Sequence, residues 1–200
     1  LMDKGKNIKI SLAVIYILII GIFLWFFFKY FSIQDFTSYE LIKSNRDALN
    51  LIKDKNVFLS GAIFLLVCVC WTLLLGFASP IFLISGFVFG KWLGFLISLF
   101  GLTIGATLLY LISNFLLKDF IYEKFFSRFN FLIQKIRKNE FIYFVIYRAI
   151  GGIPFFLQNL LPILFNISLR TYFFGTLIGL APQLFIGASL GAGVDKIIDQ

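Results

Sequence analysis

The sequence contains no histidine and only two cysteines in 200 residues. The absence of histidine excludes the usual general base, the Ser-His and Cys-His nucleophile pairs and histidine-ligated metal sites. Cys68 and Cys70 are two residues apart in an expected helix, so their side chains point about 200° apart and cannot share a metal ion. We therefore expect no enzyme activity, no metal and no cofactor.

Acidic residues are missing from two long stretches, between Asp54 and Asp119 and between Glu140 and Asp195. Several runs carry no charge of either sign: 10–28, 56–90, 92–117, 149–169 and 171–194. Each run is close to or longer than the roughly 20 residues that a helix needs to cross the hydrocarbon core. With 60% hydrophobic residues, the chain is predicted to be an all-α polytopic membrane protein.

The net charge of +8 is spread over the connections beside the apolar runs, where basic residues set topology and meet anionic headgroups. Nucleic acid is therefore not an expected partner. Connection 118–140 has six basic and three acidic residues, whereas 32–56 has four of each. The positive-inside rule places the basic N-terminus and 118–140 inside and 32–56 outside. We expect a bacterial inner (plasma) membrane protein with a cytoplasmic N-terminus and a retained first anchor.

Two apolar stretches, 57–90 and 92–117, separate these connections. If both crossed the membrane, the basic connection would lie outside. The conflict disappears if 57–90 is a re-entrant hairpin that turns near Ala78, Ser79 and Pro80, because proline lacks an N–H and breaks a helix. The sequence therefore predicts a dip into the membrane rather than a crossing.

An internal repeat supports this topology. FGLTIG at 100–105 returns as FGTLIG at 174–179, 74 residues later, and the same offset places Pro80 on Pro154. Broken backbone at membrane depth is tolerated only where it is buried in protein or lines a watery cavity. We predict an inverted repeat of two re-entrant helical hairpins, each followed by a transmembrane helix, with a cavity between the hairpin tips.

Glycines and prolines at the breaks and along the spans are expected to shape the hairpins and to let helix backbones approach closely. These hairpin and packing residues are Pro80, Gly86, Gly90, Gly101, Gly105, Gly151, Gly152, Gly175, Gly179 and Pro182. The expected organisation is an anchor over 1–31, an amphipathic connection over 32–56, a membrane domain over 57–190 and a polar tail over 191–200. Within the membrane domain, repeats 57–117 and 141–190 flank an amphipathic linker, 118–140.

Arg148 is the first candidate site residue because it lies in apolar sequence with no carboxylate nearby in the chain. A buried cation needs a partner or water, and a guanidinium suits phosphate through its forked donors. The alternative is that Arg148 snorkels to the interface. The amides Gln158, Asn159 and Gln183 could bond freed hairpin backbone or a headgroup. Arg170 is either a further contact or a topology anchor.

These residues together resemble a known family. The series Arg148, Pro154-Phe155, Asn159, Arg170-Thr-Tyr172, Gly175, Gly179 and Pro182 is similar to the C-terminal signature of the SNARE-associated Golgi protein (VTT-domain) family, of the DedA superfamily. The first copy fits through Gly86, Gly90, Gly94, Gly101, Gly105 and Tyr110. The resemblance covers roughly 57–190. Three features depart from it. Residues 77–90 have no carboxylate, so proton coupling is not implied, and Asn114 stands where an arginine is frequent. The family usually has another span after the second copy, so the tail over 191–200 is expected to precede a missing last span.

The resemblance implies two re-entrant hairpins and a role in moving lipids between leaflets, as in phospholipid scrambling and the recycling of isoprenoid-phosphate carriers. Carried over by position, Arg148 would bind the phosphate, Pro154 would shape the hairpin, and Asn159 would line or brace the site. The expected partners are membrane lipids, either anionic phospholipid or polyprenyl phosphate, and a homo-oligomer is left open. The alternatives are a small-ion or metabolite transporter and a non-transporting membrane scaffold.

Overall fold

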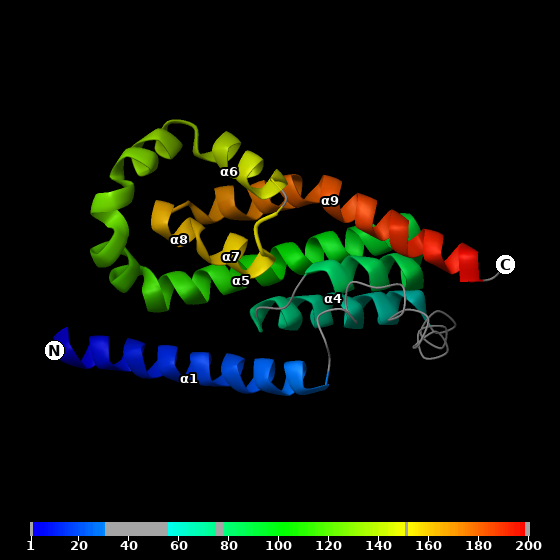
Figure 1. The fold of residues 1–200 in the computed structure, drawn as a ribbon, viewed down its shortest axis with the longest axis horizontal. Helices are drawn as coiled ribbons and strands as arrows, with labels where there is room; N and C mark the ends of the chain where they lie inside the picture. The colour runs from blue at the N-terminus through cyan, green and yellow to red at the C-terminus, as the bar shows by residue number, and fades with distance from the viewer. Residues whose placement is uncertain (1, 31–55, 75–77, 151, 199–200) are drawn as a thin grey trace.

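The computed structural model describes residues 2–30, 56–74, 78–150 and 152–198, and over these the chain is helical with short connections (Figure 1). The helices are α1 (Met2–Tyr30), α4 (Val57–Leu73), α5 (Ala78–Lys138), α6 (Glu140–Ala149), α7 (Phe155–Leu160), α8 (Pro162–Phe165) and α9 (Leu169–Ile198). Three stretches are long and apolar enough to cross a membrane: Ile8–Phe26, Ala78–Asp119 and Leu169–Val194. The predicted all-α class is confirmed. The expected connection 32–56 lies outside the described residues except for Asn56.

The first predicted break is present between α4 and α5. Asn56 begins α4 as its N-cap, with Oδ1 accepting from the Phe58 N–H at 3.1 Å. Helix α4 ends at Leu73, and α5 begins at Ala78. Pro80 therefore falls in the first turn of α5, where the missing N–H has no intrahelical partner to lose.

A second reversal divides α5 at Gly90, whose φ of 75° and ψ of 174° are not helical. A side chain at Gly94 would collide with the carbonyl oxygen of Ser85. In a straight helix these two residues would be about 13 Å apart along the axis. The chain therefore doubles back at Gly90, and the apolar stretch Ala78–Asp119 is a short arm followed by a separate long helix.

The long part of α5 holds α4 through its Gly-x-x-x-Gly pair. A Cβ added at Gly101 would lie 2.6 Å from the Cβ of Cys68, and one at Gly105 would lie 2.8 Å from the Cβ of Thr72. Because the residue numbers at these contacts increase in the same direction along both helices, α4 and this part of α5 run parallel. The two glycines permit the close backbone approach that the sequence predicted.

Helix α9 holds α6 in the same way. A Cβ at Gly175 would lie 3.2 Å from a ring carbon of Phe144, and one at Gly179 would lie 2.9 Å from the carbonyl oxygen of Val145. These helices also run parallel. Each Gly-x-x-x-Gly pair thus packs against the short helix that begins its own repeat, which is α4 in the first repeat and α6 in the second.

The two long helices cross in opposite directions. Phe95 of α5 meets Phe185 of α9 with ring centroids 5.5 Å apart. Farther along, Tyr110 stacks on Tyr172 at 4.2 Å. From the first contact to the second, the residue numbers rise along α5 and fall along α9, so the two helices are antiparallel. The two repeats of the chain therefore point in opposite directions.

The second break follows α6. Gly152 has a φ of 91°, which favours glycine, and Pro154 is the N-cap of α7. Gly151 lies outside the described residues. The return arm of the second hairpin consists of α7 and α8, with Pro162 opening the second helix. It ends at Asn166, which adopts a left-handed conformation.

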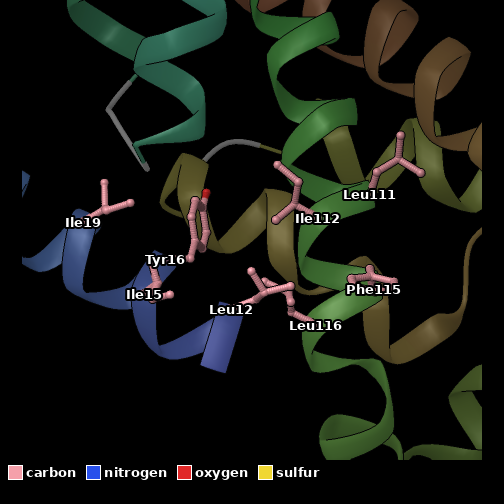
Figure 2. Close-up of a pocket in the computed structure, with 8 residues that line it drawn as sticks. All are labelled: Leu12, Ile15, Tyr16, Ile19, Leu111, Ile112, Phe115 and Leu116. Carbon is pink, nitrogen blue, oxygen red and sulfur yellow. The ribbon is translucent and has the colours of Figure 1, made fainter. Parts of the chain in front are cut away.

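Helix α1 leans on α5 across an apolar groove of about 490 Å³ (Figure 2). The groove is lined by Leu12, Ile15, Tyr16, Ile19, Leu111, Ile112, Phe115 and Leu116. Two polar contacts fix the helix: Lys9 pairs with Asp119 at 3.1 Å, and the Tyr16 hydroxyl donates to the Leu73 carbonyl at 2.5 Å. The N-terminal end of α1 and the basic segment after Asp119 therefore lie at the same end of the molecule.

Two boundaries differ in form from the expected organisation. Helix α5 continues without a break through 118–138, so the expected linker is an extension of the long helix that curves round the end of the bundle and returns to α6 (Figure 1). Helix α9 continues to Ile198, so most of the expected polar tail is helical.

Candidate functional site

Arg148 lies in the last turn of α6 and is completely buried. It shares the buried face of this helix with Phe144, one turn earlier. Both residues pack on α9, where a side chain at Gly179 would collide with the Cβ of Arg148. The predicted alternative of a guanidinium snorkelling to the interface does not describe this conformation.

The Arg148 guanidinium is held by three neighbours. Its Nη1 donates to Oδ1 of Asn159 at 2.8 Å. Its Cζ lies 5.3 Å from the ring centroid of Phe144 and 4.9 Å from that of Tyr172. Among the described residues, the donors Nε and Nη2 have no hydrogen-bond partner, and neither does Nδ2 of Asn159. No carboxylate forms an ion pair with Arg148 within the part of the chain that the structure describes.

Tyrosine hydroxyls brace the backbone around this pair. Tyr172 donates to the Asn159 carbonyl at 3.1 Å, so α9 holds the residue that holds Arg148. Tyr110 donates to the Ile167 carbonyl at 2.6 Å, which ties α5 to the start of α9. Asn159 is therefore fixed through its main chain as well as its side chain.

Two glutamines satisfy the broken end of α6. The last four carbonyls of a helix have no hydrogen-bond donor within the helix. At membrane depth, bulk water does not supply the missing donors. Nε2 of Gln158 donates to the Ile150 carbonyl at 3.0 Å, and Nε2 of Gln183 donates to the Ala149 carbonyl at 2.9 Å. When the longer bonds at 3.4 Å are included, the two amides donate to the backbone carbonyls of Tyr147, Arg148, Ala149 and Ile150.

A cavity of about 210 Å³ lies between the two helix breaks, where the sequence predicted one. Its lining is Ala78, Ser79, Phe82, Ile150, Gly152, Ile153, Phe155, Gln158, Leu180, Gln183 and Leu184. We call this space the tip cavity. The candidate site residue Arg148 is not part of this lining. Long helical side chains lean toward the helix N-terminus, and Arg148 accordingly packs beside Phe144 rather than at the tip.

The other predicted site residues lie at different places. Pro154 is exposed at the N-cap of α7, and Arg170 is exposed at the start of α9. The structure thus brings Arg148, Gln158 and Asn159 together and leaves Arg170 outside the cluster. Gln183, the one amide in the apolar run 171–194, was expected to bond freed backbone or a headgroup, and it donates to carbonyls at the end of α6.

At the opposite end of α6, Glu140 joins the starts of two helices. Its Oε1 accepts from the Ser168 N–H at 2.9 Å and from the Ser168 hydroxyl at 2.8 Å. Burial would raise the pKa of Glu140, but the bonds from Ser168 and Thr171 and the charge of Arg137 hold this pKa below its usual value. The carboxylate therefore clamps the beginnings of α6 and α9 together.

Comparison with known proteins gives one family. The family model described as the VTT domain matches residues 75–193, which include Arg148 and the whole tip cavity lining. A Transmembrane protein 41 homolog from Dictyostelium discoideum is 30% identical over 163 residues, covering 78% of this chain and 48% of that protein. One from Caenorhabditis elegans is 26% identical over 138 residues, covering 66% and 56%. The chain spans about half the length of these curated relatives. No solved structure matches it.

Proposed function

Because this chain belongs to the VTT-domain (SNARE-associated Golgi protein, DedA) family of membrane proteins, we propose that it moves phosphate-bearing lipids between the two leaflets of its membrane. The headgroup passes through the protein while the acyl tails remain in the bilayer. Phospholipid and isoprenoid phosphate are the two lipid classes that fit this proposal. The membrane concerned, predicted from the sequence to be a bacterial inner membrane, stays a prediction, since both named relatives are eukaryotic.

The lengths of the short helices support re-entrant topology. Helix α4 has 17 residues and α6 has 10, which correspond to about 25 Å and 15 Å. Both are shorter than the roughly 30 Å hydrocarbon core. Since the halves of the bundle point in opposite directions, we propose that each hairpin enters from its own membrane face and that the two tips meet at the tip cavity.

The observation that carries the lipid-phosphate proposal is the buried guanidinium with unused donors. Nε and Nη2 of Arg148 and Nδ2 of Asn159 are N–H donors without a partner. A phosphate oxygen accepts such bonds, and the guanidinium fork matches its geometry. Because Arg148 is fully enclosed here, a phosphate reaches it only when α7 moves away from α6. We therefore interpret this conformation as the closed state of the exchange cycle.

Reconstitution in liposomes tests the proposal. Leaflet exchange is followed with a fluorescent phospholipid and with a fluorescent phosphate-free glycolipid. We expect wild type to exchange the phospholipid and Arg148→Ala to do so at least about tenfold more slowly, while Arg148→Lys is intermediate because it keeps the charge without the fork. Arg137→Ala, which removes an exposed arginine, serves as the matched control and keeps the wild-type rate.

The glycolipid separates binding from folding. If Arg148 binds phosphate, Arg148→Ala slows the phospholipid alone; equal losses for both lipids would show a structural role instead. Wild type without any lipid exchange contradicts the proposed function. Flux of a soluble anion in the absence of lipid exchange would favour the small-ion transporter.

A further inference from the structure

The end of α7 depends on tyrosine hydroxyls from two other helices. The last four carbonyls of a helix have no donor within it, and Pro162 has no N–H to offer the Gln158 carbonyl four residues earlier. The Tyr147 hydroxyl of α6 donates to that carbonyl at 3.2 Å. The Tyr172 hydroxyl of α9 donates to the Asn159 carbonyl at 3.1 Å. These two side chains therefore supply the bonds that the junction between α7 and α8 removes.

The two helices of the return arm are attached to the bundle in different ways. Of the three buried residues of α7, two are the amides Gln158 and Asn159, and the third is Phe155 in its first turn. In α8, Ile163 is completely buried and packs in an apolar cluster that includes Ile167. Segments with few buried apolar contacts open at a lower free energy than the core does. We therefore expect α7 to detach more easily than α8.

Leu161 joins the two helices without tying one to the other. Its N–H donates back to the Leu157 carbonyl at 2.9 Å, and its own carbonyl accepts from the Leu164 N–H at 3.0 Å. Among the described residues, no backbone hydrogen bond spans the ψ angle of Leu161. This angle is −34°, and a residue before proline also adopts about +120 to +160°. A change in this one angle therefore swings α7 while the hydrogen bonds within α7 and α8 remain.

We propose that α7 is a gate that swings at Leu161 and that Tyr147 and Tyr172 are the positioning residues that hold it shut. With α7 closed, Asn159 lies against the Arg148 guanidinium. With α7 open, the unpaired donors Nε and Nη2 of Arg148 become accessible. The two hydroxyls act through the main chain of α7 rather than on a ligand. The purpose of the gate rests on the proposed function, because opening admits a phosphate to Arg148, whereas the swing itself does not require lipid exchange.

The rate at which phenylglyoxal, a small arginine-directed reagent, modifies Arg148 measures how often the gate opens. The full chain is labelled in neutral detergent and read peptide by peptide by mass spectrometry, with the exposed Arg137 and Arg170 as internal references. Arg148 is completely buried, so it reacts only from the open state. Tyr172→Phe keeps the ring beside Arg148 and loses only the hydroxyl. We expect this variant to label Arg148 about fivefold faster than wild type, relative to the reference arginines.

Tyr110→Phe is the matched control, because it removes a buried hydroxyl that donates to a carbonyl beyond α8, that of Ile167, at 2.6 Å. We expect it to lower the thermal unfolding midpoint about as much as Tyr172→Phe does but to leave Arg148 labelling at the wild-type rate. The double variant Tyr147→Phe/Tyr172→Phe should label faster than Tyr172→Phe alone. Equal acceleration by Tyr110→Phe and Tyr172→Phe would mean that the tyrosines only stabilise the fold, and unchanged labelling in the double variant would mean that they hold no gate; either result overturns the proposal.

Phospholipid exchange by the same preparations in liposomes distinguishes failure of the gate from failure of the proposed function. Faster Arg148 labelling in Tyr172→Phe, in a protein whose wild type exchanges no lipid, keeps the gate and rejects lipid exchange. Lipid exchange by wild type, with equal Arg148 labelling in wild type, Tyr172→Phe and the double variant, rejects the gate and keeps the function.

Discussion

Arg148 keeps a buried position through contacts that are individually modest. A desolvated cation over an aromatic ring gains about 2 kcal/mol or more, and a hydrogen bond to a charged group contributes about 1.5–3 kcal/mol. Arg148 has two such rings and one such bond. Against these stand a burial cost of several kcal/mol for the charge and two unpaired donors. Stability alone gives no reason for an arginine here, which is why we assign Arg148 a ligand.

Glu140 predicts an acid-sensitive contact at the other end of the same helix. Its folded-state pKa lies below the usual value of 4.5, so the carboxylate contributes stability that is fully present above about pH 4.5 and is lost as the pH falls through the lower folded-state pKa. At pH 7 we expect Glu140→Ala to lower the free energy of unfolding by about 1–2 kcal/mol through the lost bonds to Ser168. Chemical unfolding in detergent followed by helical circular dichroism measures this.

Glu140→Gln is the matched comparison for this carboxylate. Its amide oxygen can still accept from Ser168 but carries no charge, so we expect a smaller loss at pH 7 and no carboxylate-dependent change below pH 4.5. An unchanged difference between wild type and Glu140→Ala from pH 7 to pH 3 would show that the ionised carboxylate is not the stabilising group.

At the scale of elements, glycine contacts decide how close the short helices lie to the long ones. A methyl group at Gly179 would meet Arg148 and the Val145 carbonyl oxygen, so Gly179→Ala must push α6 away from α9. Overpacking of this kind costs about 1–3 kcal/mol. We expect Gly179→Ala to lower the unfolding midpoint and to slow phospholipid exchange, because Arg148 and the helix that carries it are both displaced.

Gly21 offers the matched substitution in α1. A Cβ there would meet nothing within 4 Å, and alanine is favoured over glycine in a helix interior by about 0.5–1 kcal/mol. We therefore expect Gly21→Ala to be neutral or slightly stabilising by the same measurements. If Gly179→Ala proved as stable and active as Gly21→Ala, close packing of α6 on α9 would not be needed.

The helix breaks were predictable because their causes are local. Proline and glycine limit the backbone wherever they occur, and the breaks lie near Pro80 and Pro154 as expected. The close packing at the two Gly-x-x-x-Gly pairs was also predictable, because small residues four apart let helix backbones approach closely. The sequence named Gln183 as an amide that could bond freed backbone, but which carbonyls it binds depends on how α9 folds back against the end of α6. The direction of Arg148 was not predictable, because it depends on the same packing. The sequence also predicted the repeat 57–117 and the linker 118–140 as separate segments, because their charge content differs. In the structure one continuous helix joins them through 118–138.

At the scale of the whole molecule, the ends of each hairpin lie at one end of the bundle. Asn56 and Gly90 bound the first hairpin, and Asn139 and Ser168 bound the second. The pairing of Lys9 with Asp119 places the start of α1 at the same end as the basic extension of α5. The positive-inside rule then predicts that this end is cytoplasmic.

Cysteine accessibility tests this topology with single cysteines at Asn56, Lys91, Asn139 and Arg170 in a chain whose Cys68 and Cys70 are alanine. A membrane-impermeant maleimide should label Asn56→Cys and Lys91→Cys from outside, and Asn139→Cys and Arg170→Cys only after the cytoplasmic face is opened. The reason is physical: α4 and the arm 78–89 are each too short to cross the core alone. A permeant maleimide controls for reactivity at each site. Labelling of Asn56→Cys and Lys91→Cys from opposite faces would mean that the first hairpin crosses the membrane, and the tip cavity would then no longer be a meeting point of two re-entrant hairpins.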